Sequence, residues 1–147
     1  MGLETVQKSI AINASPQQCY DALCQFESYP QWQSAVQSIK IVERYPDGRP
    51  RDVEVVVHAV VKKIRYVLRY QYDDVRRKLS WTYVEGDVRD AQGWYEFKEV
   101  DGSKTEATCQ MGVDPGFWVP KTIRNTLTEV TLTKSMEELR VYAEKKA

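Results

Sequence analysis

The last third of the chain constrains the fold most strongly. The segment from Pro115 to Pro120 is followed by a run to Ala147 that contains neither proline nor glycine. Such a run is typical of one long helix, because these two residues disfavour helix interiors most. Apolar and small residues recur along it at spacings of three and four, which places them on one broad face: Leu127, Thr128, Thr131, Leu132, Ser135, Met136, Leu139, Tyr142 and Ala143. We therefore predict a terminal helix that packs this face against the rest of the chain.

Hydroxyl side chains interrupt the apolar residues of this face at Thr128, Thr131 and Ser135. A helix that only sealed a core would carry larger apolar residues there, because protein interiors are close packed. The pattern therefore favours a helix that lines a cavity. The alternative is an ordinary core in which the hydroxyls bond back to the carbonyls of their own helix, and both interpretations stand.

The first part of the chain predicts a strand followed by two short helices. Residues 4 to 13 have the pattern of a strand. A helix is expected to begin after Ser15, where Pro16 suits the first helical position and Gln18 completes a capping box. The segment 29 to 32 predicts a further helical turn.

From residue 39 onward the hydrophobic period changes to two, which indicates strands. Between 52 and 62 the odd positions are apolar and are expected to face inward, and between 64 and 72 the even positions are. Turn residues follow each run. The sequence thus predicts an α+β fold of about seven strands in hairpin order, two short helices and one long terminal helix.

Aromatic side chains with polar tips gather on the inward face of these strands. Buried tyrosine and tryptophan need hydrogen-bond partners, so the set favours a roomy amphipathic pocket, although each hydroxyl could instead reach solvent at the sheet rim. We predict a ligand cavity lined by Tyr66, Tyr70, Trp81, Tyr83, Tyr95, Phe97, Met111, Phe117, Trp118, Arg124, Thr128, Leu132 and Met136.

Catalytic and metal-binding signals are weak. His58, the single histidine, shares a strand face with Glu54 and is expected to point to solvent. The three cysteines lack paired spacing, which predicts free thiols and no metal site. We therefore assign no catalytic residue, no metal and no cofactor. Arg124 could pair with a ligand carboxylate, or it is an ordinary surface arginine.

Charge and hydropathy narrow the partners. Lys plus Arg equals Asp plus Glu at 21 each, so no global charge attracts nucleic acid. A leader peptide and membrane-spanning runs are not expected, which predicts a soluble cytoplasmic protein. Phe117 and Trp118 lie between two prolines, where they could form a gate or contact a membrane transiently, or cap the core. The basic residues between 62 and 78 are expected on the outer sheet face, with an anionic-surface patch as the alternative.

Several short motifs resemble the polyketide cyclase/dehydrase and coenzyme Q-binding START-like proteins of the SRPBCC superfamily. They are Asn13-Ala14-Ser15-Pro16, Tyr20-Asp21, Phe26, Tyr29-Pro30-Gln31-Trp32, Ser80-Trp81 with Glu85-Gly86, Tyr95-Glu96-Phe97, and Asp101-Gly102 before Thr105-Glu106. The resemblance covers nearly the whole chain, taken as one START-like domain over residues 1–147. It implies the helix-grip fold, in which a curved antiparallel sheet wraps the terminal helix around a hydrophobic tunnel.

Function is less closely tied to this resemblance than the fold is. It implies binding or carriage of a lipid, quinone or polyketide-like molecule, which we expect to be non-catalytic. An aromatase/cyclase is the first alternative, with Tyr66, Tyr70 or Arg124 promoting dehydration of a folded polyketide. A ribosome-associated interaction module that uses the basic sheet face is the second.

Overall fold

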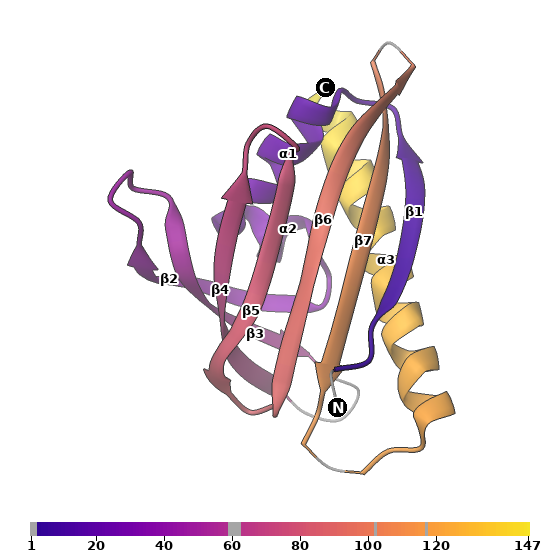
Figure 1. Ribbon diagram of the computed structural model, residues 1–147. Coiled ribbons are helices and arrows are strands. Elements are labelled where there is room, and N and C mark those ends of the chain that lie inside the picture. The colour runs from indigo at the N-terminus through magenta and orange to yellow at the C-terminus, as the bar shows by residue number, and fades with distance from the viewer. Residues whose placement is uncertain (1–2, 59–62, 102, 117) are drawn as a thin grey trace.

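A curved antiparallel sheet wraps around the long helix α3 (Figure 1). The computed structural model describes residues 3–58, 63–101, 103–116 and 118–147, and within them seven strands form one sheet in the order β1-β7-β6-β5-β4-β3-β2. The elements are β1 (Val6–Ile12), α1 (Pro16–Cys24), a 3-10 turn (Phe26–Ser28), α2 (Tyr29–Trp32), β2 (Val36–Arg44), β3 (Pro50–His58), β4 (Lys63–Asp73), β5 (Lys78–Gly86), β6 (Asp90–Asp101), β7 (Lys104–Asp114) and α3 (Lys121–Lys146). This arrangement confirms the predicted helix-grip architecture.

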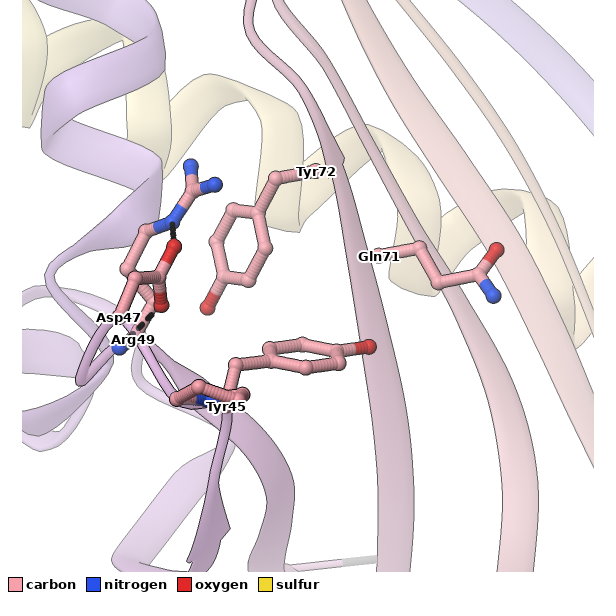
Figure 2. A pocket seen from close by; sticks show the side chains of 6 residues that line it. Tyr45, Asp47, Arg49, Gln71 and Tyr72 are labelled. Carbon is pink, nitrogen blue, oxygen red and sulfur yellow. Dashed lines mark hydrogen bonds and ion pairs between the residues drawn. The ribbon is translucent and has the colours of Figure 1, made fainter.

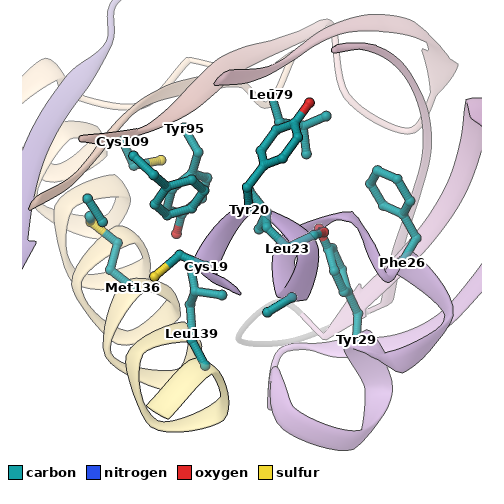
Figure 3. Close-up of a cluster of buried hydrophobic side chains, with 14 of the residues drawn as sticks. Cys19, Tyr20, Leu23, Phe26, Tyr29, Leu79, Tyr95, Cys109, Met136 and Leu139 are labelled. Carbon is teal, nitrogen blue, oxygen red and sulfur yellow. The ribbon is translucent and has the colours of Figure 1, made fainter. Parts of the chain in front are cut away.

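Helix α1 begins at the predicted capping box. The Ser15 hydroxyl accepts a hydrogen bond from the Gln18 backbone N–H at 3.2 Å, and the Gln18 side chain accepts one from the Ser15 N–H at 2.9 Å. These bonds satisfy donors that a helix start otherwise leaves unpaired. The cap fixes α1 so that Cys19 and Leu23 are buried. In the core these side chains lie near Met136 and Leu139 of α3 (Figure 3).

The strand faces follow the predicted parity. Val53 and Val55 of β3 are buried, and Leu68 and Tyr70 of β4 face the same core. Strands β3 and β4 are antiparallel, with Val53 opposite Leu68 and Val55 opposite Tyr66. These four side chains therefore lie on one face of the sheet. The sequence predicts that β3 continues through residues 59–62, which lie outside the described residues.

The outer face of β3, β4 and β5 carries paired charges. The Arg65 guanidinium contacts Glu54 at 2.8 Å and Glu85 at 2.9 Å. Arg69 contacts the buried carboxylate of Asp52 at 2.8 Å. Arg65 and Arg69 therefore lie on the outer face as expected, with acidic partners on neighbouring strands, whereas Arg76 and Arg77 lie in the turn between β4 and β5.

The single broad face predicted for α3 divides into two narrower ones. Leu132, Met136, Leu139 and Ala143 are buried in the core, where α3 packs mainly on β1, β7 and α1. Thr131 and Ser135 lie on the adjacent side, toward β3 and α2, and line a cavity. At Thr128 the alternative interpretation holds, because its hydroxyl donates to the Arg124 carbonyl at 2.9 Å. Leu127, expected inward, is 53% exposed, because the first turns of α3 lie away from the core.

Candidate ligand-binding cavity

A cavity of about 380 Å³ lies between the inner face of the sheet, α2 and α3. This volume falls within the range of small-molecule sites, roughly 300 to 1,000 Å³. The cavity wall is mostly apolar, with valine, isoleucine, leucine and aromatic side chains from β3 to β7. Five residues predicted from the sequence line it: Tyr66, Tyr70, Trp81, Tyr95 and Met111.

Aromatic rings form a continuous wall across β4, β5 and β6. The ring centroids of Tyr70 and Trp81 lie 6.1 Å apart, and those of Trp81 and Tyr95 lie 6.2 Å apart. Phe26 extends the wall, with its centroid 4.5 Å from that of Tyr70. Aromatic pairs in tilted contact stabilise one another beyond simple burial, so these contacts help to hold the wall together.

Gly93 makes room for Trp81 in this wall. The two residues are paired across β5 and β6. A Cβ at position 93 would collide with the Trp81 ring and would lie 2.5 Å from the Gln110 carbonyl oxygen. A glycine within a strand often marks such a close approach. The indole can therefore lie against the sheet, which leaves the space in front of it open.

The hydroxyl groups of the tyrosines separate into two classes. Six of the nine donate a hydrogen bond to a named acceptor, for example Tyr29 to the Leu23 carbonyl at 2.5 Å and Tyr83 to the Val88 carbonyl at 2.5 Å. The other three, Tyr66, Tyr70 and Tyr95, all line the cavity.

Two of these three hydroxyls have no partner among the described residues. Tyr95 interacts with Ser135 and Cys109, whereas nothing in the described part of the chain pairs with the hydroxyl of Tyr66 or Tyr70. Within the same residues, no side-chain oxygen that is sealed from solvent lacks a partner. The Tyr66 and Tyr70 hydroxyls are therefore open to the cavity, where a ligand can reach them.

Burial keeps these phenols neutral. Removal from water raises the pKa of Tyr66 to about 12. It also raises the pKa of Tyr70 and that of Tyr95 well above their usual value. A neutral phenol donates and accepts hydrogen bonds but is a weak base. At physiological pH the three side chains can thus orient a ligand oxygen without carrying charge.

Polar and charged side chains surround the cavity where it meets solvent. His58, Lys134 and Glu138 line it and are exposed or half-buried, and Gln33 donates to the Ser135 hydroxyl beside them. The Glu138 carboxylate accepts from the Ser34 backbone N–H at 3.2 Å. His58 is exposed as expected, but it lies at this rim because β3 ends there. Sequence reasoning missed Gln33, Lys134 and Glu138, whose position depends on how α3 lies against α2.

Several predicted cavity residues lie elsewhere. Leu132 and Met136 belong to the core beneath α3, because the buried side of that helix faces β1 and β7. Phe97 is also a core residue, with its ring stacked 5.8 Å from Tyr95. Tyr83 packs at the edge of the core with its hydroxyl bonded to Val88. None of these four is among the residues that line the cavity in the described structure.

The remaining predicted residues lie near the start of α3. Arg124 pairs with Glu4 at 3.6 Å, on the side of the helix toward the N-terminal segment. The Thr128 hydroxyl is bound to its own helix. Trp118 is 84% exposed. These three do not line the described cavity, and Phe117 lies outside the described residues.

A second hollow lies at the end of the β2–β3 hairpin (Figure 2). The side chains that line it interact mainly with one another and with neighbouring residues. The Arg49 guanidinium lies over the Tyr72 ring, 4.4 Å from its centroid, and contacts Asp47 at 3.0 Å and Asp74 at 2.9 Å. The Tyr45 hydroxyl donates to the Tyr70 carbonyl at 2.6 Å. The Arg49 guanidinium in this hollow is thus already paired with two carboxylates, so the internal cavity is the stronger candidate site.

The described residues contain no cluster of three or more His, Cys, Asp or Glu side chains placed to hold a metal ion. No helix among them has the length and apolar character needed to cross a bilayer.

Solved structures with the same fold support this architecture. A START superfamily protein from Mycobacterium smegmatis superposes with a TM-score of 0.91 at 21% identity, over 97% of this chain and 99% of that one. A protein from Thermus thermophilus gives 0.79 at 20% identity, over 97% and 95%. The Zhui aromatase/cyclase from a Streptomyces species gives 0.85 at 15% identity, over 99% and 96%. At these identities the likeness establishes the fold alone.

Sequence comparison identifies the family. No curated protein matches the chain significantly. The model of the family described as polyketide cyclase / dehydrase and lipid transport matches residues 12–140, which is most of the sequence. The chain therefore belongs to the polyketide cyclase/dehydrase and lipid transport family, with the START-like fold that its sequence predicted.

Proposed function

We propose that this protein binds and carries a hydrophobic small molecule whose oxygen atoms accept hydrogen bonds from Tyr66 and Tyr70. The observation that supports this most directly is the pair of unpartnered hydroxyls, among the described residues, in an otherwise apolar cavity. When a ligand fills the cavity and excludes water, a hydroxyl left without a partner costs about 1 to 3 kcal/mol. A ligand oxygen that bonds to each hydroxyl offsets this cost.

The apolar walls contribute most of the binding energy in this proposal. Apolar surface removed from water stabilises a complex by roughly 25 cal/mol per Å². The Trp81 and Tyr95 rings offer flat surfaces that suit a ring system, and the valines near the rim suit an aliphatic part. Among the ligands expected from the family, quinones and polyketide-like molecules carry carbonyl groups that can accept hydrogen bonds from the two hydroxyls, whereas a plain hydrocarbon chain carries no acceptor.

We favour a carrier over an enzyme because the inner wall, as far as the described residues form it, carries no side chain suited to act as a base. General acid–base catalysis works best with a group whose pKa lies near the working pH. Burial instead raises the pKa of each tyrosine in the wall. In the described residues, the charged or imidazole side chains of the cavity, His58, Lys134 and Glu138, lie at its rim. The aromatase/cyclase alternative requires one of these three to reach the ligand.

A matched pair of ligands tests the proposal. 9,10-Anthraquinone and anthracene share a ring skeleton and differ in two carbonyl oxygens, and both can be followed by quenching of tryptophan fluorescence. The double substitution Tyr66→Phe with Tyr70→Phe removes only the hydroxyls. We expect it to weaken anthraquinone binding by roughly tenfold or more, at about 1 kcal/mol for each hydrogen bond, and to leave anthracene binding unchanged.

Tyr83→Phe is the matched control, because its hydroxyl is already bonded to Val88. It should affect neither ligand. If neither ligand binds the parent protein, the proposal that the cavity binds a hydrophobic molecule is wrong. Equal loss of both ligands in the double variant would show that the rings, and not the hydroxyls, recognise the ligand. Conversion of a bound polyketide analogue, lost in His58→Ala, would favour the cyclase.

A further inference from the structure

The N-terminal half of α3 presents apolar side chains to solvent. Ile123, Leu127 and Val130 are 52%, 53% and 61% exposed, and Trp118 in the preceding loop is 84% exposed. From 122 to 131 no described side chain of this helix is buried. In Figure 1 these first turns of α3 run outward from the sheet. We call Trp118, Ile123, Leu127 and Val130 the apolar face.

The three helical members of the apolar face point away from the core. At about 100° per residue, Ile123, Leu127 and Val130 fall within a sector of about 60°. The core side of the same helix, which includes Leu132 and Met136, is centred about 180° from that sector. The helix therefore carries apolar residues on two opposite sides, the outer set in its N-terminal half and the core set further along. Helix packing inside the protein accounts only for the core side.

The apolar face is continuous with the rim of the ligand cavity. Val130, Lys134 and Glu138 line the cavity and also line a shallow groove along the outer side of α3. By the same angles, Lys134 lies within the sector of the apolar face and Glu138 lies about 20° beyond it. The cavity-lining residues Thr131 and Ser135 come next, before the core side. A molecule leaving the cavity between α3 and β3 would thus pass directly onto the apolar face.

Charge on this segment is close to balanced. Between 118 and 131 the charged residues are Lys121, Arg124 and Glu129. Arg124 is paired with Glu4. Such a surface has little attraction for nucleic acid or for a strongly charged protein, whereas it is compatible with a zwitterionic lipid surface. Tryptophan, which is exposed here at position 118, is also enriched at the interface between lipid and water.

From these observations we propose that the apolar face docks on the surface of a lipid bilayer and inserts its side chains among the headgroups. The cavity rim then faces the lipid, so a hydrophobic ligand can pass between bilayer and cavity with little exposure to water. Docking depends on apolar insertion and not on basic residues. It is a property of the protein without ligand, and it can be tested whether or not the cavity function is correct.

Flotation with vesicles tests the proposal. The unliganded protein is mixed with phosphatidylcholine vesicles, and bound protein is measured across lipid concentrations at 50 and 500 mM NaCl. We expect binding that is the same at both salt concentrations, because no counterions are released. The double substitution Trp118→Ser with Leu127→Gln should weaken it at least tenfold, because each side chain loses burial in an apolar layer.

Val75→Ser with Val100→Ser is the matched control. These valines are 90% and 65% exposed, and they lie in or beside the turns at the opposite end of the sheet. The control should bind vesicles as the parent does, and all three proteins should melt at similar temperatures. Equal binding by the parent and the Trp118/Leu127 variant would overturn the proposal. So would the absence of parent binding, binding that needs anionic lipid and is lost in salt, or a parent dimer that the same variant dissolves.

Discussion

Tyr70 and Tyr29 allow a stringent test of how the cavity is built, because they are nearly identical except at the hydroxyl. Both are buried, both contact the ring of Phe26, and both line the cavity. The Tyr29 hydroxyl donates to the Leu23 carbonyl at 2.5 Å, whereas that of Tyr70 has no partner in the described part of the chain. Replacing each by phenylalanine removes one oxygen atom and keeps the ring.

The two substitutions should have different effects on the free energy of unfolding. Tyr29→Phe loses a hydrogen bond in a buried position and should destabilise the protein by about 1 to 2 kcal/mol. Tyr70→Phe removes a hydroxyl that is open to the cavity and has no partner in the described part of the chain, so the free energy of unfolding should stay the same or rise slightly. For a chain of this size, 1 kcal/mol corresponds to roughly 2 to 4 °C in the melting temperature.

Thermal and urea melts of the unliganded proteins measure this difference directly. We expect Tyr29→Phe to melt about 2 to 8 °C below the parent and Tyr70→Phe to melt at or above it. Equal destabilisation by both substitutions would mean that the Tyr70 hydroxyl has a partner within the protein. The argument that this hydroxyl is kept for a ligand would then fail.

Three further predictions concern the wall, the outer sheet face and the thiols. Gly93→Ala should lower stability by about 1 to 3 kcal/mol and shift the tryptophan fluorescence, because its Cβ collides with Trp81; an unchanged melt and spectrum would contradict the close packing. The hydrogen bond from Arg69 holds the pKa of Asp52 below its usual value, so the ionised Asp52 side chain stabilises the folded protein. This stabilisation is fully present above the pKa of Asp52 in the unfolded chain, about 3.9, and is lost as the pH falls through the pKa of Asp52 in the folded protein. Urea midpoints of the parent and of Asp52→Asn should therefore converge below about pH 4, and a constant gap would refute this. Burial raises the pKa of all three cysteine thiols, so a disulfide reagent at pH 8 should label the native protein far more slowly than the urea-unfolded one; equal rates would place the thiols at the surface.

The fold could be predicted from local pattern because its signals are local. The Ser15 capping box, the alternation in β3 and β4, and the proline-free run of α3 each specify an element without reference to the rest of the chain. The tyrosine and tryptophan side chains of the wall followed from strand parity. Their role in ligand binding stays a prediction.

The cavity face of α3 could not be predicted in the same way. Helical periodicity places Leu132 and Ser135 on one broad side, and only the packing of α3 on β1 and α1 decides that the first lies in the core and the second at the cavity. Hydroxyl partners depend on tertiary contacts too. Tyr83 and Tyr70 both face inward from the sheet. Only the Tyr83 hydroxyl is close enough to the turn at Val88 to donate to the backbone carbonyl there.

The position of β1 at the sheet edge, paired with β7, has a consequence for how the chain reaches its native state. The register joins Ile12 to Thr105 and Val6 to Met111, so each contact spans roughly a hundred residues. During synthesis β1 emerges first and its partner strand emerges after five others, which at about 5 to 20 residues per second is a delay of several seconds or more. Long-range pairing of this kind is slow because the intervening chain must be ordered first. Docking of β1 should therefore be a late folding event, and the newly made chain should be most prone to aggregation before it occurs.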